Sequence, residues 1–201
     1  MTANRNKSRE SLVWLCKTAV FAALLMMLQM TGLGMIKTPW GLSFTLYGMV
    51  VVVGTLAIDL KAGLILSAVF GGISAWQNAT ALDMVATNPI FPLRTWSVTA
   101  VVVLCILPRL LIPVVTCGVR WLLKRTRLNE HVSLALNGCI GSLTNTAFFL
   151  GLMLILYMVM GTLPDWVVAY AGTAVSVNGV AEAVLTTIAT PAVVLALSKL
   201  K

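Results

Sequence analysis

Charge is scarce in this chain. Only 10% of its 201 residues are charged, whereas in a soluble domain the share is about a quarter. The few charges sit at the ends of apolar segments and form no basic face, so the net charge of +8 does not indicate nucleic-acid binding. Apolar residues make up 59% of the chain and gather in runs near bilayer length, which predicts an integral membrane protein.

Residues that usually carry catalysis or hold metals are also few. His131 is the single histidine, and no carboxylate spacing suits a metal ion. Ser142 has no base at a recognisable spacing, and the chain has no Gly-Lys pair and hence no phosphate-binding P-loop. The four cysteines share no metal or redox spacing: Cys16, Cys105, Cys117 and Cys139. We therefore predict no enzyme, no metal and no cofactor bound by this chain, so that uphill transport would need an ion gradient or a partner ATPase.

The apolar runs predict an all-α membrane protein, a single domain over residues 1–201 folded as a bundle of about six transmembrane helices. The predicted spans are 18–33, 42–58, 62–76, 97–123, 132–160 and 169–197. Since only Asp59-Leu60-Lys61 joins the second span to the third, these two are expected to form a tight helical hairpin. The basic N-terminus imitates a secretory signal, but its apolar run is too long, and we expect it to be a retained first span.

Lysine and arginine are distributed unevenly between the two ends of these spans. With the N-terminus inside, only Lys37 and Arg94 fall in outer loops, and Arg109 lies within the fourth span. The inner segments hold the rest: Arg5, Lys7, Arg9, Lys17, Lys61, Arg120, Lys124, Arg125, Arg127, Lys199 and Lys201. This bias predicts that both termini are cytoplasmic.

Four polar residues fall near the middle of the predicted spans, where such groups are costly: Arg109, Asn145, Asn178 and Glu182. At 1.5 Å rise per residue they share one depth band, and the last two are one turn apart on one helix face. Two hypotheses follow. Either Arg109 and Glu182 neutralise each other and the amides tie helices together, or the four line a cavity in which Arg109 meets an anionic ligand. The second is favoured for Arg109 and Asn145, and for Glu182 the two are balanced.

Two outer loops, 34–43 and 77–95, carry tryptophan, proline and polar residues, and Trp76 and Trp96 stand at the ends of the second. Each tryptophan alone is typical of an interfacial aromatic belt. As a group, long loops over a helical bundle can act as lids over a ligand.

Small residues recur on the first span, with Ala19 and Ala23 one turn apart. They indicate either close packing inside the bundle or a flat strip that docks another membrane subunit, and the pattern does not choose between these.

Three motifs of the second half resemble the substrate-binding (S) components of energy-coupling factor (ECF) vitamin transporters. They are Leu107-Pro108-Arg109-Leu110-Leu111-Ile112-Pro113, Gly141-Ser142-Leu143-Thr144-Asn145-Thr146 and Val177-Asn178-Gly179-Val180-Ala181-Glu182-Ala183. Their order, their spacing and the six-span frame match, and the motifs look most like the pantothenate type. The first half of the chain is less distinctive.

The resemblance implies six helices in a bacterial cell membrane and a vitamin site built from the later helices and capped by outer loops. It also implies partners, namely a transmembrane coupling subunit, docked at Ala19 and Ala23, and two ATPase subunits that use ATP. Arg109 would suit the carboxylate of pantothenate, and Asn145 and Asn178 its hydroxyls and amide. Other S-component ligands (pyridoxine, hydroxymethylpyrimidine or folate), a stand-alone ion-coupled carrier using Glu182 and a structural membrane-assembly protein are the alternatives.

Overall fold

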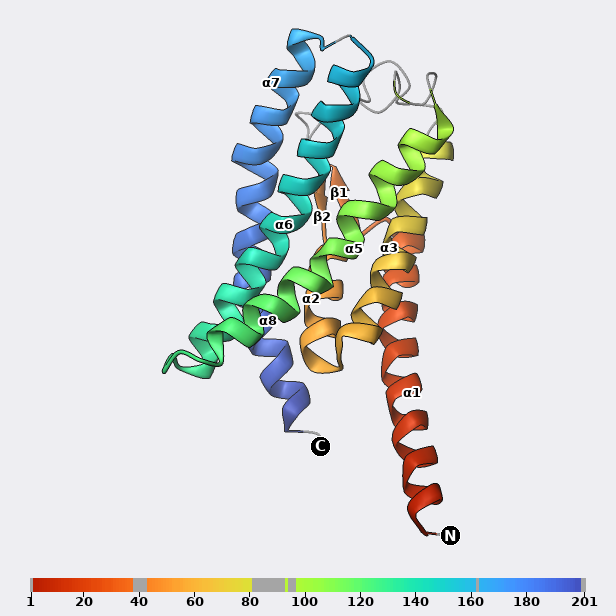
Figure 1. Ribbon diagram of the computed structural model, residues 1–201, viewed down its shortest axis with the longest axis vertical. Coiled ribbons are helices and arrows are strands. Elements are labelled where there is room, and N and C mark those ends of the chain that lie inside the picture. Colours follow the sequence, from red (N-terminus) through yellow and green to blue (C-terminus); the bar gives the residue numbers. More distant parts are fainter. Residues whose placement is uncertain (1, 38–42, 81–92, 94–96, 162, 200–201) are drawn as a thin grey trace.

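The protein is described by a computed structural model, which covers residues 2–37, 43–80, 93, 97–161 and 163–199. Long helices run side by side along the long axis of the molecule (Figure 1). They are α1 (Thr2–Thr31), α3 (Leu60–Thr80), α5 (Val98–Leu123), α6 (Glu130–Val159) and a last rod made of α7 (Asp165–Thr173), the π-helical segment η1 (Ala174–Gly179) and α8 (Val180–Ser198). Within the described residues, five helical segments are long and apolar enough to cross a membrane, which makes this a multi-pass membrane protein.

The sixth helix, α2 (Tyr47–Ala57), is shorter than the predicted span 42–58. Part of the difference is a two-stranded antiparallel hairpin of β1 (Met35–Lys37) and β2 (Ser43–Thr45), in which Ile36 pairs with Phe44. The predicted all-α bundle is confirmed, and this short hairpin is an addition to it that was not predicted. Its β-branched and aromatic residues suit a strand, but a run of three residues is too short to show a period of two.

α2 forms the centre of the bundle. Its sequence is apolar on every side, and its four consecutive valines, Val50 to Val53, are all buried. A helix that is apolar all round has to be covered all round. It packs against α1, α3, α5, α6 and α8, and its side chains join Leu66 and Phe70 of α3 in one apolar cluster.

A second apolar cluster lies toward the other end of the long helices and joins α5, α6, α7 and η1. Leu104 and Cys105 of α5 pack there with Met153 and Tyr157 of α6. The two clusters meet along α5, because Leu104 belongs to the second and Ile112 to the first.

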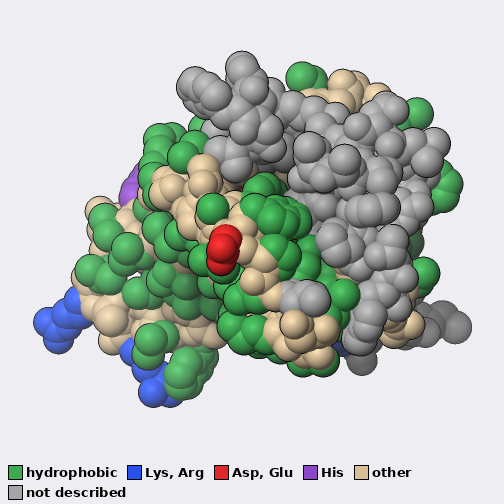
Figure 2. All heavy atoms as spheres, turned by 90° about the horizontal axis from the view of Figure 1, so that it is seen from above, with side chains coloured by type: hydrophobic (Ala, Val, Ile, Leu, Met, Phe, Trp, Pro, Cys, Tyr) green, Lys and Arg blue, Asp and Glu red, His purple; other side chains and the backbone are tan. Residues whose placement is uncertain are grey.

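The N-terminal end of α1 and the C-terminal end of α8 lie at the same end of the bundle, together with the α2–α3 turn and the α5–α6 loop (Figure 1). We call this the terminal end and the opposite one the distal end. The expected tight hairpin of α2 and α3 is present: Asp59 lies between the helices and its Oδ1 accepts from the backbone N–H of Ala62 at 2.8 Å, which caps α3. Figure 2 views the distal end, where hydrophobic side chains predominate among the described residues and Lys and Arg appear only at the edge.

Close approach of α6 and α8 depends on Gly138. A Cβ atom there would lie 2.6 Å from the Thr186 carbonyl oxygen and 2.6 Å from Thr190 Oγ1. We expect Gly138→Ala to push the helices apart and lower stability by about 1–3 kcal/mol. The measurement is the melting temperature of the purified protein in detergent. Gly151→Ala on the same helix is the matched control, because a Cβ there meets nothing within 4 Å. Equal melting temperatures for the two variants would contradict this packing.

Candidate functional site

Arg109 lies inside the bundle, where the two apolar clusters meet on α5. Its side chain is 7% exposed. Nη1 donates to the Leu104 carbonyl oxygen at 2.9 Å and Nη2 donates to Ser74 Oγ of α3 at 3.0 Å. The guanidinium carbon also lies 4.5 Å from the ring centre of Phe149 on α6 and 5.3 Å from that of Phe70 on α3. Three helices therefore hold this cation in place.

The positive charge of Arg109 is not cancelled by a carboxylate in direct contact. In the part of the chain that the structure describes, Arg109 forms no ion pair, and its Nε is buried without a hydrogen-bond partner. Aromatic faces attract a cation, but they do not replace a counter-ion. A buried charge without a partner is costly, and the cost falls if an anion binds beside it.

Asn145 lies on the α6 face that contacts α5. It precedes Phe149 by one turn on the same face, and Phe149 covers Arg109. One turn before Asn145, Gly141 packs against Thr116 of α5, where a Cβ atom would lie 3.0 Å from the hydroxyl oxygen. This register places Asn145 about one helical turn from the level of Arg109. Its side chain is 9% exposed, and its Oδ1 has no hydrogen-bond partner among the described residues.

Asn178 lies in η1, next to the same part of α6. Its neighbour Gly179 packs against Thr146, where a Cβ atom would lie 3.2 Å from the threonine methyl carbon. A π-helical segment widens the helix locally and often occurs at functional sites. The sequence had predicted one continuous helix over 169–197, because nothing in an apolar run of Ala, Val and Ser marks a π segment.

Glu182, in the first turn of α8, contacts the hairpin instead of Arg109. Its Oε1 accepts from the backbone N–H of Thr45 at 2.6 Å and from the Thr45 hydroxyl at 2.9 Å. Glu182 is half-buried, and its charge and that of Arg109 interact through space without an ion pair. The hairpin is thus fastened to α8 at the level of the polar residues.

We expect Glu182→Ala to detach the hairpin and to lower stability by about 1.5–3 kcal/mol, since it removes both hydrogen bonds to a charged acceptor. Glu182→Gln keeps a side-chain oxygen for Thr45 and should retain most of the stability. The measurement is the melting temperature of both variants. Thr45→Val is the matched control, because it removes only the hydrogen bond from the Thr45 hydroxyl to Glu182. If Gln destabilises as much as Ala, the negative charge itself is needed, as it would be if Glu182 served mainly to neutralise Arg109.

Trp76 and the two alanines lie away from these polar residues. Trp76 is 68% exposed on α3, and Trp96 lies outside the described residues. Ala19 and Ala23 are exposed on α1, whereas Thr18 and Leu25 are buried against the bundle. The structure therefore brings the helices of Arg109, Asn145, Asn178 and Glu182 together and leaves the two alanines on the outer surface.

Several residues of the site were not predicted. Phe70 and Ser74, one turn apart on α3, contact Arg109, and Thr45 contacts Glu182. A further network joins three helices, because both Tyr47 Oη and Gln77 Nε2 donate to Gln29 Oε1 at 2.7 Å. Gln29 was visible in the sequence as an amide within an apolar run, a signal equal to that of Asn145.

The chain was compared with protein-family models and with curated proteins, and nothing matches it in either.

Proposed function

We propose that this chain is the membrane-embedded substrate-capture subunit of an ATP-driven importer of the ECF type, in a bacterial cell membrane and with both termini in the cytoplasm. It binds a small water-soluble vitamin, and pantothenate fits best. A transmembrane coupling subunit and two ATPase subunits complete the transporter. The proposal rests on the resemblance of the three motifs and on the chemistry of the residues that carry them.

One observation carries the choice of an anionic ligand. Among the described residues no carboxylate contacts the buried cation of Arg109, and the Asn145 side-chain oxygen, about one turn away, has no hydrogen-bond partner there. A carboxylate is the group that an arginine recognises best, through charge-assisted hydrogen bonds. The hydroxyls and amide of pantothenate are matched by amide side chains, which both donate and accept.

The test is a direct search for the ligand. We expect native mass spectrometry of the purified chain to detect pantothenate, either carried through purification or added in stoichiometric amount. Pantothenol, which replaces the carboxylate by an alcohol, is the matched control and should bind at least about tenfold more weakly, since the loss of a charge-assisted contact costs roughly 1.5–3 kcal/mol.

Equal affinity for pantothenate and pantothenol would contradict the role of Arg109 as the anion receptor. Uptake by the chain alone in proteoliposomes, driven by a proton gradient without any ATPase, would instead support the stand-alone carrier that uses Glu182.

A further inference from the structure

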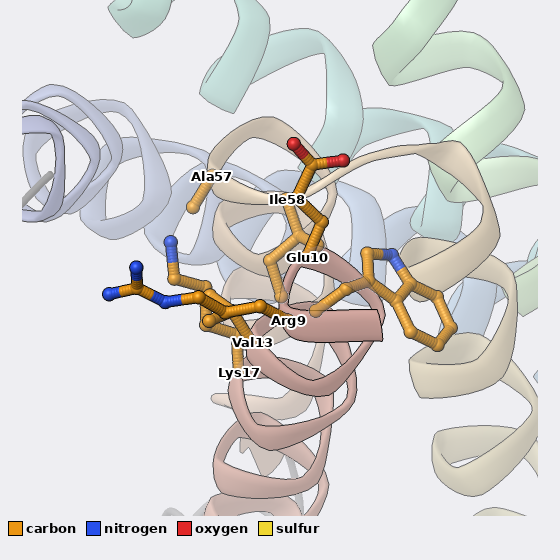
Figure 3. Close-up of a pocket in the computed structure, with 7 residues that line it drawn as sticks. Arg9, Glu10, Val13, Lys17, Ala57 and Ile58 are labelled. Carbon is orange, nitrogen blue, oxygen red and sulfur yellow. The ribbon is translucent and has the colours of Figure 1, made fainter. Parts of the chain in front are cut away.

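A groove opens at the terminal end of the bundle, and the residues that line it are distant from Arg109 in the sequence. It has a volume of about 470 Å³ and lies between the first half of α1 and the end of α2. Figure 3 shows the residues that line it: Arg9, Glu10, Val13, Trp14, Lys17, Ala57 and Ile58. None of them belongs to the predicted vitamin site, so the groove needs a separate explanation.

Two cations stand on one wall of the groove. Arg9 and Lys17 are eight residues apart on α1, about 80° around the helix and about 12 Å along it, and both line the groove. Their charged groups extend toward the same side, and the carboxylate of Glu10 points in another direction (Figure 3). Among the described residues neither cation forms an ion pair. The groove therefore presents two cations and one carboxylate, a net positive charge, with no close ion pair among the described residues.

Apart from Glu10, the rest of the groove is apolar or aromatic, and a hydrogen bond fixes one wall. Val13 of α1 faces Ala57 and Ile58 at the end of α2. α1 is fastened here because the Trp14 indole N–H donates to Asp59 Oδ2 at 3.0 Å, while the other oxygen of Asp59 caps α3. This contact sets the width of the groove.

The groove lies beside the start of the apolar span of α3, a level at which lipid headgroups are expected. The apolar part of α3 begins at Leu60, immediately after the α2–α3 turn that forms one wall. A tryptophan such as Trp14 is typical of the level where hydrocarbon meets water. Cations at this level attract anionic lipids, whose phosphates lie in the same layer.

We propose that this groove binds one anionic glycerophospholipid, such as phosphatidylglycerol. The phosphate lies between the guanidinium of Arg9 and the ammonium of Lys17, and the first part of an acyl chain packs on Val13 and Ile58. Arginine and lysine are the usual partners of phosphate. A free phosphate would make no contact with the apolar wall, whereas the acyl chain of a lipid would pack against it. This site is independent of the vitamin site.

The experiment uses the full chain in nanodiscs of phosphatidylcholine with a small fraction of phosphatidylglycerol. After transfer to detergent, native mass spectrometry measures the retained lipid. We expect the unaltered chain to retain one phosphatidylglycerol in preference to phosphatidylcholine. The double variant Arg9→Gln with Lys17→Gln should bind it about tenfold to thirtyfold more weakly. Ile58→Trp, which fills the groove and leaves the charges, should also lower the retained lipid.

The matched control is Lys124→Gln with Arg127→Gln, which removes two exposed charges from the α5–α6 loop near the same end. It should retain the lipid as the unaltered chain does. Equal loss in the control, or no loss in the groove variants, would overturn the proposal.

A separate competition experiment adds inorganic phosphate or glycerol phosphate. If either displaces the lipid at millimolar concentration, the groove is a phosphate site and not a lipid site. Neither Ala19 nor Ala23 is substituted in these variants, so the strip keeps its two small residues.

Discussion

Replacing Arg109 by methionine is expected to abolish high-affinity pantothenate binding while the protein still inserts and purifies as a monodisperse bundle. The loss of a charge-assisted contact costs roughly 1.5–3 kcal/mol, which is about tenfold to more than a hundredfold in affinity. Methionine is long and apolar, so it can still pack between the rings of Phe70 and Phe149. Isothermal titration calorimetry with pantothenate measures the effect.

The melting temperature of the same variant separates binding from structure. If Arg109 serves a ligand, removing a buried and unneutralised charge should leave the stability of the ligand-free protein nearly unchanged or higher. Only the stabilisation by added pantothenate should disappear. Arg120→Met on the same helix is the matched control, because Arg120 is half-exposed near the terminal end. A ligand-free Arg109→Met protein that no longer folds would show that Arg109 is a structural residue held by Ser74 and the Leu104 carbonyl.

The double variant Ala19→Trp with Ala23→Trp is expected to lose co-purification with the coupling and ATPase subunits and to lose ATP-dependent uptake in vesicles. Both alanines are exposed, and a bulky residue at either position would keep a second helix from approaching closely. Pantothenate binding by the isolated chain should be unchanged, since the residues that hold Arg109 come from α3, α5 and α6.

Val114→Trp with Gly118→Trp is the control for this variant. Both positions are exposed and one turn apart on α5, and a Cβ at Gly118 meets nothing within 4 Å. It should assemble and transport normally. If the α1 variant also assembles and transports, the docking strip is refuted. If it loses pantothenate binding as well, the alanines serve internal packing after all.

α1 lies at the periphery of the bundle. Only 11% of its apolar window is buried, against 44% for α3 and for α5. It contacts α2 and α3, and its other side faces outward along most of its length. A helix so weakly packed is where a further subunit could add the most contact area.

The sequence was a good guide where one physical constraint dominates. Bilayer length defined five of the helices, because lipid permits few alternatives to a long apolar helix. It was a poorer guide at 42–58, where an apolar run of the same kind is divided between a strand and a short buried helix. Composition reports that such a segment avoids water, and it does not report whether lipid or protein covers it.

The polar residues also divide into those that the sequence predicts and those that only the fold reveals. Arg109, Asn145 and Glu182 were found because each is costly within an apolar run. Their partners Phe70, Ser74 and Thr45 are ordinary residues in an apolar chain, and only the packing of α3 and of the hairpin against them gives them a role. The π segment at Asn178 depends on backbone hydrogen bonding that leaves no compositional trace.

The short central helix has a consequence for the hairpin that precedes it. Eleven residues of α2 rise only about 16 Å, roughly half of a hydrocarbon core of about 30 Å, and the hairpin lies at mid-height of the bundle (Figure 1). Backbone that is not helical is tolerated at membrane depth only where protein or a water-filled cavity covers it, and at Thr45 the cover is Glu182 of α8, which accepts from the Thr45 backbone N–H.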